Sequence, residues 1–394
     1  MPAPPAIAAF LSRCDLLAPP APEGYVERSR FSTRVHARLG GSESGHILLL
    51  GQLGVGKSTE LWALERQLSS TYCVIRPPAG FLPDLAITGW PEIFVYVALW
   101  AADTQRAPGA SPAQALENAL GQEIYELARK FKFAGVGSKS SPTLLQRFHS
   151  DLTEIKKTIS AAPSMFWDLA ASVVRELETH AGRPALLLLD GLEKAPDATA
   201  RSLFQEQRRW LSALPLRAVI TAPVWLSFEP FFGDVEQAVS AVERLRALET
   251  IRDTPGWEFL VTLASKRGAL GVFSAVQLEE AITWSGGLPR QFLQILAEAA
   301  SRALSDGLDA VTPVCMMRAR RRVAERFQYQ LGPEDFAELA KGDTERSRTA
   351  RASLLRVGAL IEVEDAKGSL RFAINPLVDE IMKTRRAEAQ GAAR

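Results

Sequence analysis

The chain has 394 residues, of which 47% are hydrophobic and 23% charged, and its formal net charge is +1. This length suits two or three globular domains, and the near-zero charge excludes a protein that binds polyanions through its bulk charge. The three cysteines, Cys14, Cys73 and Cys315, lie far apart, which argues against a disulfide framework and for a reducing compartment. Because no secretory signal and no bilayer-length apolar run is visible, we expect a cytoplasmic protein without a membrane partner.

Residues 1–45 are predicted to be an N-terminal arm followed by a helical lead-in. Residues 1–24 are rich in proline and alanine and have room for one short helix, and residues 25–45 have a helical pattern. The core of the fold is expected to start at His46.

A phosphate-binding motif stands at the beginning of this core. Residues 47–50 are an apolar run of strand length, and a helical pattern opens at residue 58. The residues between and just after them match G-x-x-x-x-G-K-[ST] at every fixed position and are Gly51, Gln52, Leu53, Gly54, Val55, Gly56, Lys57, Ser58 and Thr59. A strand, a glycine turn and a helix N-terminus direct backbone N–H groups at a phosphate. Lys57 is expected to reach the β- and γ-phosphates of a nucleotide, and the Ser58 hydroxyl to hold Mg²⁺.

A long stretch separates this motif from the next informative segment. Residues 71–76 are predicted to form a second strand, and residues 103–163 are polar and helical in pattern. This stretch is too long for a simple connection between adjoining strands, so we expect a helical insertion. An amphipathic helix is predicted over residues 165–180.

The next predicted strand ends in an acidic residue. Residues 185–189 are one alanine and four leucines, which suits a parallel strand covered on both faces. Asp190 follows at the carboxyl end, where open α/β sheets bind ligands, so it is a candidate Mg²⁺ ligand. Glu193 fits two readings: it orients or deprotonates an attacking water, or it is a charge at a helix N-terminus.

The remaining elements complete an α/β core over residues 46–255 and lead into a different kind of structure. A helix is predicted over residues 198–214, a strand over 216–221, and residues 247–251 are a candidate fifth strand. Helical patterns around Gly286 indicate a helical lid over residues 256–330. In residues 331–394 two helices precede two short strands, which is the order of a winged-helix domain.

In this order the residues resemble the AAA+/STAND branch of P-loop ATPases, close to bacterial replication-initiator-like and signalling ATPases. The resemblance covers most of residues 25–380. Tyr25 and Arg28 are similar to an aromatic-x-x-Arg segment, which implies that Arg28 contacts the nucleotide. Thr221 resembles the sensor 1 residue, which implies that it detects the γ-phosphate. The sequence Gly-Gly-Leu-Pro-Arg at residues 286–290 resembles the lid's sensor 2 segment, which implies that Arg290 reaches the nucleotide.

One departure from that family bears on turnover. Many AAA+ enzymes have Glu directly after the metal-binding Asp, whereas this chain has Gly191 there and its acidic residue at Glu193. Without a well-placed base the attacking water is poorly activated, so we expect slow hydrolysis. Arg244 and Arg246 are in the region where an arginine finger is expected, or are solvated charges.

The resemblance implies a slowly hydrolysing ATP-dependent switch with ATP and Mg²⁺ as cofactors. Lys57, Asp190 and Glu193 would be catalytic, and Ser58 and Asp190 would hold the metal. The implied setting is signalling in a bacterial defence system, as a homo-oligomer or with an effector on another chain. Two alternatives remain open: a DNA-loaded ATPase of the initiator or transposition type, and a nucleotide-bound scaffold without turnover.

The predicted winged helix separates these readings. The helix over residues 344–357 carries several arginines, and Arg348 and Arg351 share one of its faces. In DNA-binding winged helices this element enters the major groove. In STAND-like switches the domain instead packs on the ATPase and holds it closed, and the acidic residues around the helix favour that reading.

Overall fold

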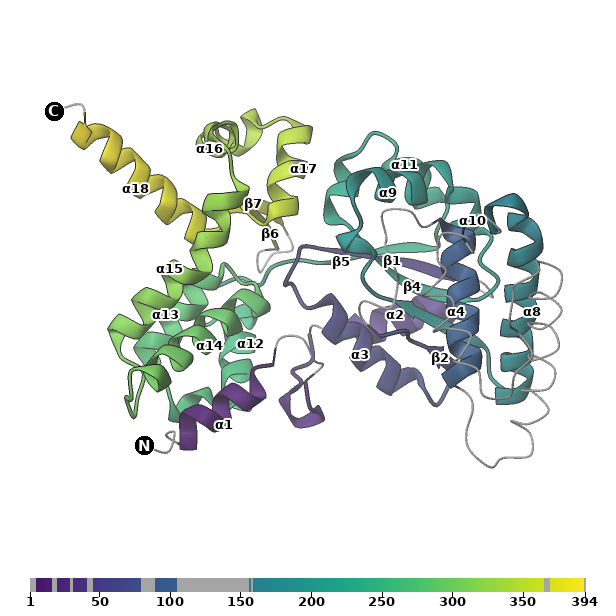
Figure 1. Ribbon diagram of the computed structural model, residues 1–394, viewed down its shortest axis with the longest axis horizontal. Coiled ribbons are helices and arrows are strands. Elements are labelled where there is room, and N and C mark those ends of the chain that lie inside the picture. Colours follow the sequence, from purple (N-terminus) through teal and green to yellow (C-terminus); the bar gives the residue numbers. More distant parts are fainter. Residues whose placement is uncertain are drawn as a thin grey trace.

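The computed structural model of the chain describes residues 5–15, 20–28, 31–40, 45–78, 89–104, 156, 159–364 and 369–392. Most of the predicted helical insertion over residues 103–163 lies outside the described residues and stays a prediction. A sheet flanked by helices makes up one side of the molecule, and a group of helices from the N-terminus and the second half of the chain makes up the other (Figure 1).

The sheet has five parallel strands, which confirms the predicted α/β fold class. The strand order is β2-β3-β4-β1-β5, with β1 (His46–Gly51), β2 (Cys73–Ile75), β3 (Ala185–Leu189), β4 (Arg217–Ala222) and β5 (Ala241–Leu245). One strand, β4, therefore separates the strand that carries the glycine loop from the strand that ends before Asp190.

The position predicted for the fifth strand is wrong. The strand lies at Ala241–Leu245, and residue 247 makes only an isolated bridge to Val363. As an edge strand, β5 is buried only at alternate positions, and its half-buried side carries Arg244. The apolar runs that revealed the central strands are absent from such an edge, because one of its faces is only half covered.

Helices cover both faces of the sheet. Leu48 and Leu50 of β1 face a cluster formed with α4 (Trp90–Thr104) and α8 (Pro163–Ala181). Ile47 and Leu49, one residue out of step, face the opposite cluster with α2 (Phe31–Gly40) and α3 (Lys57–Leu68). This alternation is that of a strand buried on both faces.

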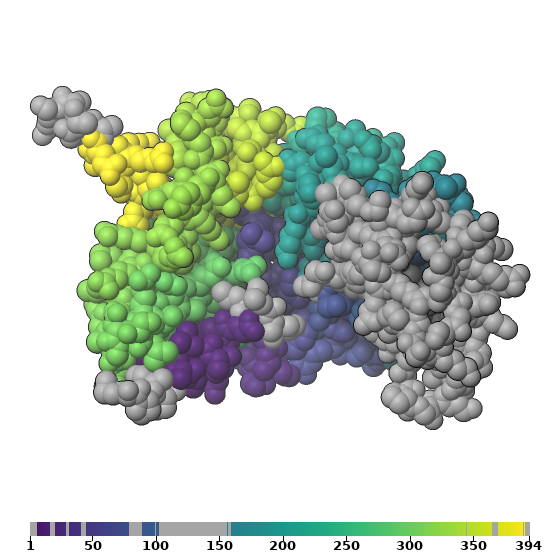
Figure 2. Space-filling model, viewed as in Figure 1, coloured from purple at the N-terminus to yellow at the C-terminus, as the bar shows by residue number. Residues whose placement is uncertain are grey.

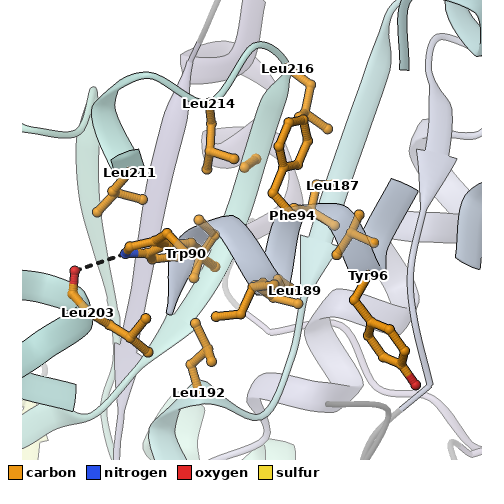
Figure 3. Close-up of a cluster of buried hydrophobic side chains, with 14 of the residues drawn as sticks. Trp90, Phe94, Tyr96, Leu187, Leu189, Leu192, Leu203, Leu211, Leu214 and Leu216 are labelled. Atoms are coloured by element: carbon orange, nitrogen blue, oxygen red, sulfur yellow. Dashed lines mark hydrogen bonds between the residues drawn. The ribbon is translucent and has the colours of Figure 1, made fainter. Parts of the chain in front are cut away.

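The cluster under α4 is built around aromatic side chains. Trp90 is fully buried, and its indole Nε1 donates a hydrogen bond of 2.8 Å to the Leu203 carbonyl oxygen (Figure 3). Leu203 lies in a π-helical turn, Ser202–Glu206, between α9 (Asp197–Arg201) and α10 (Arg208–Ser212). The single helix predicted over 198–214 is therefore interrupted. A 3-10 turn η5 (Val224–Phe228) and α11 (Phe232–Gln237) follow β4.

A second core holds the lid together. Its helices are α1 (Pro5–Arg13), α12 (Pro255–Lys266), α13 (Ala275–Ser285), α14 (Pro289–Ser305) and α15 (Pro313–Gln330). Thr254, Ser274 and Thr312 cap three of them through their side-chain oxygens. The N-terminal helix α1 packs into this core, with the rings of Phe10 and Phe273 5.3 Å apart. None of the described helices has both the length and the apolar character that a membrane span requires.

The C-terminal part has the two helices and two strands that the sequence predicts. These are α16 (Pro333–Ala340), α17 (Arg348–Val357), and an antiparallel hairpin of β6 (Leu360–Glu364) and β7 (Leu370–Ile374). A further helix, α18 (Pro376–Ala392), follows where no element is predicted from the sequence. Helix α17 begins four residues later than predicted, because residues 343–345 form a 3-10 turn and Ser347 caps the helix.

This C-terminal part lies against the core that contains the five-stranded sheet. Helix α17 packs on η5, and the rings of Phe228 and Phe372 lie 5.8 Å apart. In Figure 2 the yellow-green C-terminal elements touch the teal helices of the core at the top of the molecule. Arg356 of α17 also pairs with Asp197 at the start of α9.

Two glycines permit the closest approach between the parts. Gly286 and Gly287 have φ of 59° and 79°, in the left-handed region that favours glycine. A Cβ on Gly287 would overlap the carbonyl oxygen of Leu248, and one on Gly286 would crowd Pro376. The glycine pair that the sequence placed in the lid therefore lies where lid, core and C-terminal part meet.

Candidate functional site

The glycine loop connects β1 to α3 at the carboxyl edge of the sheet. Gly54 and Gly56 have φ of 85° and 108°, and α3 begins immediately afterwards at Lys57. The backbone N–H groups of Thr59 and Glu60 both donate to the Gly56 carbonyl, so the helix is regular from its first turn. The loop therefore has the strand, turn and helix N-terminus that a phosphate needs.

A cavity opens above this loop and receives residues from four places in the chain. Residues 53–60 line its floor. The other walls come from the N-terminal segment around Tyr25, from the turn after β3, and from lid helices α12 and α14. The sequence-predicted residues Arg28, Lys57, Ser58, Thr59, Glu193 and Arg290 all line it. Residues that are more than 260 positions apart in the sequence are thus brought together.

Lys57 lies at the bottom of the cavity and is 4% exposed. Its Nζ donates to the carbonyl oxygens of Gly51 and Gln52, at 2.7 and 3.1 Å, and lies 4.0 Å from Glu193 Oε1. Burial lowers the pKa of Lys57, and the charges of Glu193 and Asp190 oppose that shift. A phosphate oxygen here would provide the further negative charge that stabilises the ammonium.

The Asp190 carboxylate provides an oxygen that suits a cation. Asp190 is 8% exposed and lies beside Ser58, while its Oδ1 is buried without a hydrogen-bond partner among the described residues. Burial and the nearby Glu193 raise the pKa of Asp190, and the side chain of Ser58 acts to lower it. Hydroxyl and carboxylate oxygens are the ligands that Mg²⁺ prefers. Ser58 and Asp190 therefore fit the metal that the sequence motif implies.

Glu193 is held beside Lys57 by two donors, the Thr221 hydroxyl and the Gly191 N–H. The Thr221 hydroxyl donates to Glu193 Oε2 at 2.7 Å, and the Gly191 N–H donates to the same oxygen at 3.1 Å and to Thr221 Oγ1 at 2.9 Å. Burial pushes the pKa of Glu193 up, but the Lys57 charge and the Thr221 bond outweigh it, so the pKa lies below its usual value. The structure thus places Thr221 directly against Glu193; Glu193 lines the cavity, whereas Thr221 is fully buried behind it and, like Asp190, is not among the lining residues.

Arg28 is buried beneath the loop. Its guanidinium donates to the carbonyl oxygens of Val55 and Arg246. Burial lowers its pKa to about 10, and the charge of Glu60 opposes that shift. Arg28 therefore joins the loop to the end of β5, and a direct contact with a nucleotide stays a prediction.

Glu60 is a site residue that the sequence did not reveal. It is 3% exposed, and its Oε2 accepts a hydrogen bond of 3.1 Å from the Tyr25 hydroxyl. Burial raises its pKa to about 7, although the charge of Arg28 acts in the opposite direction. Nothing local marks Glu60 as buried, because its hydrogen-bond partner Tyr25 is 35 residues earlier in the sequence and only the tertiary fold brings the two together.

The lid closes the cavity from the other side. The Arg290 N–H donates to the Gly54 carbonyl oxygen at 3.1 Å, and its side-chain Cβ would lie 3.1 Å from a Cβ built on Gly54. Phe259 and Leu263 of α12, and Arg267 directly after it, also line the cavity. These residues were also missed, because only the fold brings them to the loop.

The two arginines in the region expected for an arginine finger form ion pairs within the chain. Arg244 Nη1 lies 3.5 Å from Glu362 Oε1, and Arg246 pairs with both Glu362 and Glu364, at 3.2 and 2.6 Å. Both arginines therefore join the core to the C-terminal hairpin.

No model of a known protein family matches the chain, and no curated protein matches it in sequence. Among solved structures it is similar to the ORC2 protein of Aeropyrum pernix in its ADPNP–ADP complexes, at 14% identity over 95% of this chain and 98% of that one, with a TM-score of 0.47. It is similar to the Aeropyrum pernix ORC1 protein in complex with DNA, at 14% identity over 97% of both chains and a TM-score of 0.44. It is also similar to the Thermotoga maritima RuvB Holliday junction branch migration motor, at 11% identity, coverages of 89% and 90%, and a TM-score of 0.36. Likenesses this distant transfer no activity or ligand.

The raised pKa of Glu60 predicts a pH-dependent stability. The folded chain holds this proton up to a pH of about 7, whereas the unfolded chain releases it near 4.5. The contribution of Glu60 to folding is therefore fully present below pH 4.5 and is lost as the pH rises through 7, at about 1.4 kcal/mol per pKa unit. Glu60→Gln, which keeps an acceptor for Tyr25, should melt at a higher temperature than wild type at pH 8. The difference should shrink towards pH 4.5, and parallel melting curves across this range would contradict the buried, protonated carboxyl.

Proposed function

We propose that this protein is an ATP-binding, slowly hydrolysing molecular switch of the P-loop AAA+ class. One observation carries the proposal: Lys57, Ser58, Glu193 and the lid residue Arg290 line one cavity. Two further residues adjoin this lining: Thr221, which donates to Glu193, and Asp190 beside Ser58, whose Oδ1 has no hydrogen-bond partner among the described residues. A triphosphate with its metal is the ligand whose charges match this set.

Each residue has a definite task in binding. The loop N–H groups and Lys57 would neutralise the β- and γ-phosphates, and Arg290 would approach them from the lid. Ser58 and Asp190 would hold Mg²⁺, which when bound supplies positive charge between the phosphates. The side chains of Phe259, Leu263 and Tyr25, which also line the cavity, suit a nucleobase.

Slow turnover follows from the environment of Glu193. As a general base it would take a proton from the attacking water, and such a base works best when its pKa is near the operating pH. The Lys57 charge and the Thr221 hydrogen bond hold the Glu193 carboxylate at a lowered pKa, which makes it a weak base. Thr221 would detect the γ-phosphate by keeping or breaking its hydrogen bond to Glu193.

The switch would consist of the lid and the C-terminal part moving together. Gln291, next to Arg290, exchanges hydrogen bonds of 3.1 Å with Asn375 at the start of α18. Arg326 of α15 donates to Gln291 Oε1 at 2.8 Å, and Asn375 also donates to the Gly358 carbonyl at 3.0 Å. Because this buried network joins both parts, a lid displaced by nucleotide would carry the hairpin and α17 with it.

In the first proposed output, the C-terminal part is a clamp on the core, and its release exposes a surface that binds an effector. Leu354 and Leu355 of α17 are buried in one cluster with Val224 of the core, so one face of α17 is covered. Arg351, expected on a DNA-facing surface, instead donates to the Asp343 carbonyl at 2.7 Å and lies over the Phe372 ring. The effector would be on another chain or a second copy of this one, in the cytoplasm. Neither the residues nor the comparisons support the defence setting in particular.

A DNA-loaded ATPase of the initiator type is the second candidate. It agrees with the similar structures at least as well as the first, because one of them contains DNA, and none of the three points to defence. On this chain it is favoured by the helix–helix–hairpin order of a winged helix and by the exposed Arg348 at the start of α17. In this reading α17 would meet DNA only after leaving the core. A scaffold that binds nucleotide without turnover is the remaining alternative.

Nucleotide binding should depend on Lys57. Lys57→Ala removes the cation at the bottom of the cavity, and it should abolish the thermal stabilisation by MgATP. In wild type that stabilisation should be about 2.7 kcal/mol at a hundredfold excess of ATP over the dissociation constant. Lys341→Ala, on the exposed surface of the C-terminal part, is the matched control and should respond like wild type. Equal thermal shifts in wild type and Lys57→Ala would contradict the proposal that this cavity binds the nucleotide.

Hydrolysis should be slow and should depend on Glu193. We expect wild-type turnover below ~1 s⁻¹, at the low end of enzyme rates. Glu193→Gln keeps an acceptor for Thr221 but cannot take a proton, so phosphate release should fall by about 10² or more while ATP still binds. The exposed Glu258→Gln variant is the control. A Glu193→Gln protein that releases phosphate at the wild-type rate would show that another residue is the base.

The two outputs differ in their response to freeing α17. In the DNA-loaded reading, Arg356→Ala breaks the pair with Asp197 and should strengthen binding to a short duplex, measured by fluorescence anisotropy. Adding Arg348→Ala should weaken it and reduce the slope of log K against log salt by about 0.9 for one lost phosphate contact. Arg252→Ala, at an exposed arginine just before α12, should change neither. If wild type and Arg356→Ala both fail to bind DNA at low salt, the DNA-loaded candidate is wrong and the clamp remains.

A further inference from the structure

The second residue of the glycine loop, Gln52, points away from the cavity and into the C-terminal hairpin. The motif leaves this position free, yet Gln52 is only 3% exposed. Its Nε2 donates to the Leu360 carbonyl at 2.6 Å and to the Leu355 carbonyl at 3.3 Å, and its Oε1 accepts from the Glu362 N–H at 2.8 Å. The side-chain amide thus pairs with backbone groups of β6 and the end of α17, about 300 residues later in the sequence.

The backbone of Gln52 is bound to Lys57, the lysine that is proposed to bind phosphate. Lys57 Nζ donates to the Gln52 carbonyl oxygen at 3.1 Å. One residue is therefore joined through its main chain to the group that must bind phosphate, and through its side chain to the hairpin. No other hydrogen bond among the described residues runs directly from the loop to β6.

We propose that Gln52 is the positioning residue that transmits nucleotide binding from the loop to the C-terminal hairpin. This inference rests on the proposed ATP-dependent switch and names the contact that regulates it. An ammonium has three donors, and a bound phosphate competes for them with the loop carbonyls. When Lys57 turns to the phosphate, the Gln52 carbonyl loses its partner, the peptide reorients, and the side-chain amide no longer matches the hairpin.

The hairpin is sensitive to such a change because Glu362 is bound on all sides. Its N–H is held by Gln52, its carbonyl accepts from the Ala247 N–H at 2.9 Å, and its carboxylate pairs with Arg244 and Arg246. Loss of the Gln52 bonds leaves two buried carbonyls and an N–H without that partner, which weakens the whole contact. Leu355, whose carbonyl accepts from Gln52, lies in α17, so the same loss reaches the helix that covers η5.

Hydrogen exchange in the full chain tests this coupling, with MgADP and the slowly hydrolysed analogue MgATPγS as the ligands. In wild type, MgATPγS should speed amide exchange in residues 355–364 by about fivefold, the effect of one net hydrogen bond. Gln52→Met keeps the chain length but lacks hydrogen-bonding groups, and Gln52→Asn keeps the amide but is one methylene shorter. Both should exchange fast in this segment without nucleotide and should show no further change with it.

A control variant and a separate measurement of nucleotide binding complete the test. Gln237→Met, the same substitution at an exposed position of α11 outside the cavity, should respond like wild type. A thermal shift with MgATPγS in every variant reports binding itself: absence of a shift in wild type would count against the proposed function and not against Gln52 alone. If nucleotide binds but wild type shows no change at 355–364, or if the folded Gln52 variant responds as strongly as wild type, the coupling role of Gln52 is overturned.

Discussion

The buried ammonium of Lys57 is the interaction on which the rest of the structure depends. A charge that is 4% exposed must be compensated, and the chain supplies two loop carbonyls on one side and the Glu193 carboxylate on the other. This requirement fixes the curl of the loop, the turn after β3, and the position of Thr221, which holds Glu193 in place. The sheet order makes it possible, because β4, with Thr221 near its end, lies between β1 and β3 at the same edge. The candidate chemistry follows from this arrangement of charges.

The loop is also where the three parts of the chain meet. Gly54 accepts from Arg290 of the lid, Gln52 bonds to the hairpin, and Val55 accepts from Arg28 of the N-terminal segment. Each bond leaves the loop in a different direction, so a ligand that reshapes the loop acts on the lid, the hairpin and the N-terminal segment together. The Gln291–Asn375 pair then joins lid and hairpin to one another. A loop that is bonded to three other parts of the chain in this way suits the proposed switch better than it suits an enzyme with rapid turnover.

The sequence predicts the loop and the central strands well, because their signals are local: glycines at fixed spacing and uninterrupted leucines at residues 186–189. It places β5 wrongly, since an edge strand with Glu243 and Arg244 has no apolar run. It does not reveal Glu60 or the α12 side chains, whose role depends on segments that only the tertiary fold brings close. It also offers Arg351 as a DNA contact and Arg246 near a finger position, whereas both are engaged within the chain. An arginine's charge is visible in a sequence, but its partner is not.

The most direct test of the account is a crystal structure of the full chain with a non-hydrolysable ATP analogue and Mg²⁺. We expect the phosphates to be wrapped by the N–H groups of residues 54–59 and to contact Lys57, with Mg²⁺ about 2.0–2.1 Å from its Ser58 and Asp190 ligand oxygens. The nucleobase of the analogue should lie between Tyr25 and α12. The Gln52 side chain should have left the Leu360 carbonyl, and β6 should have moved from the loop. A nucleotide bound elsewhere on the chain, or crystals that bind none at millimolar analogue, would contradict the central claim.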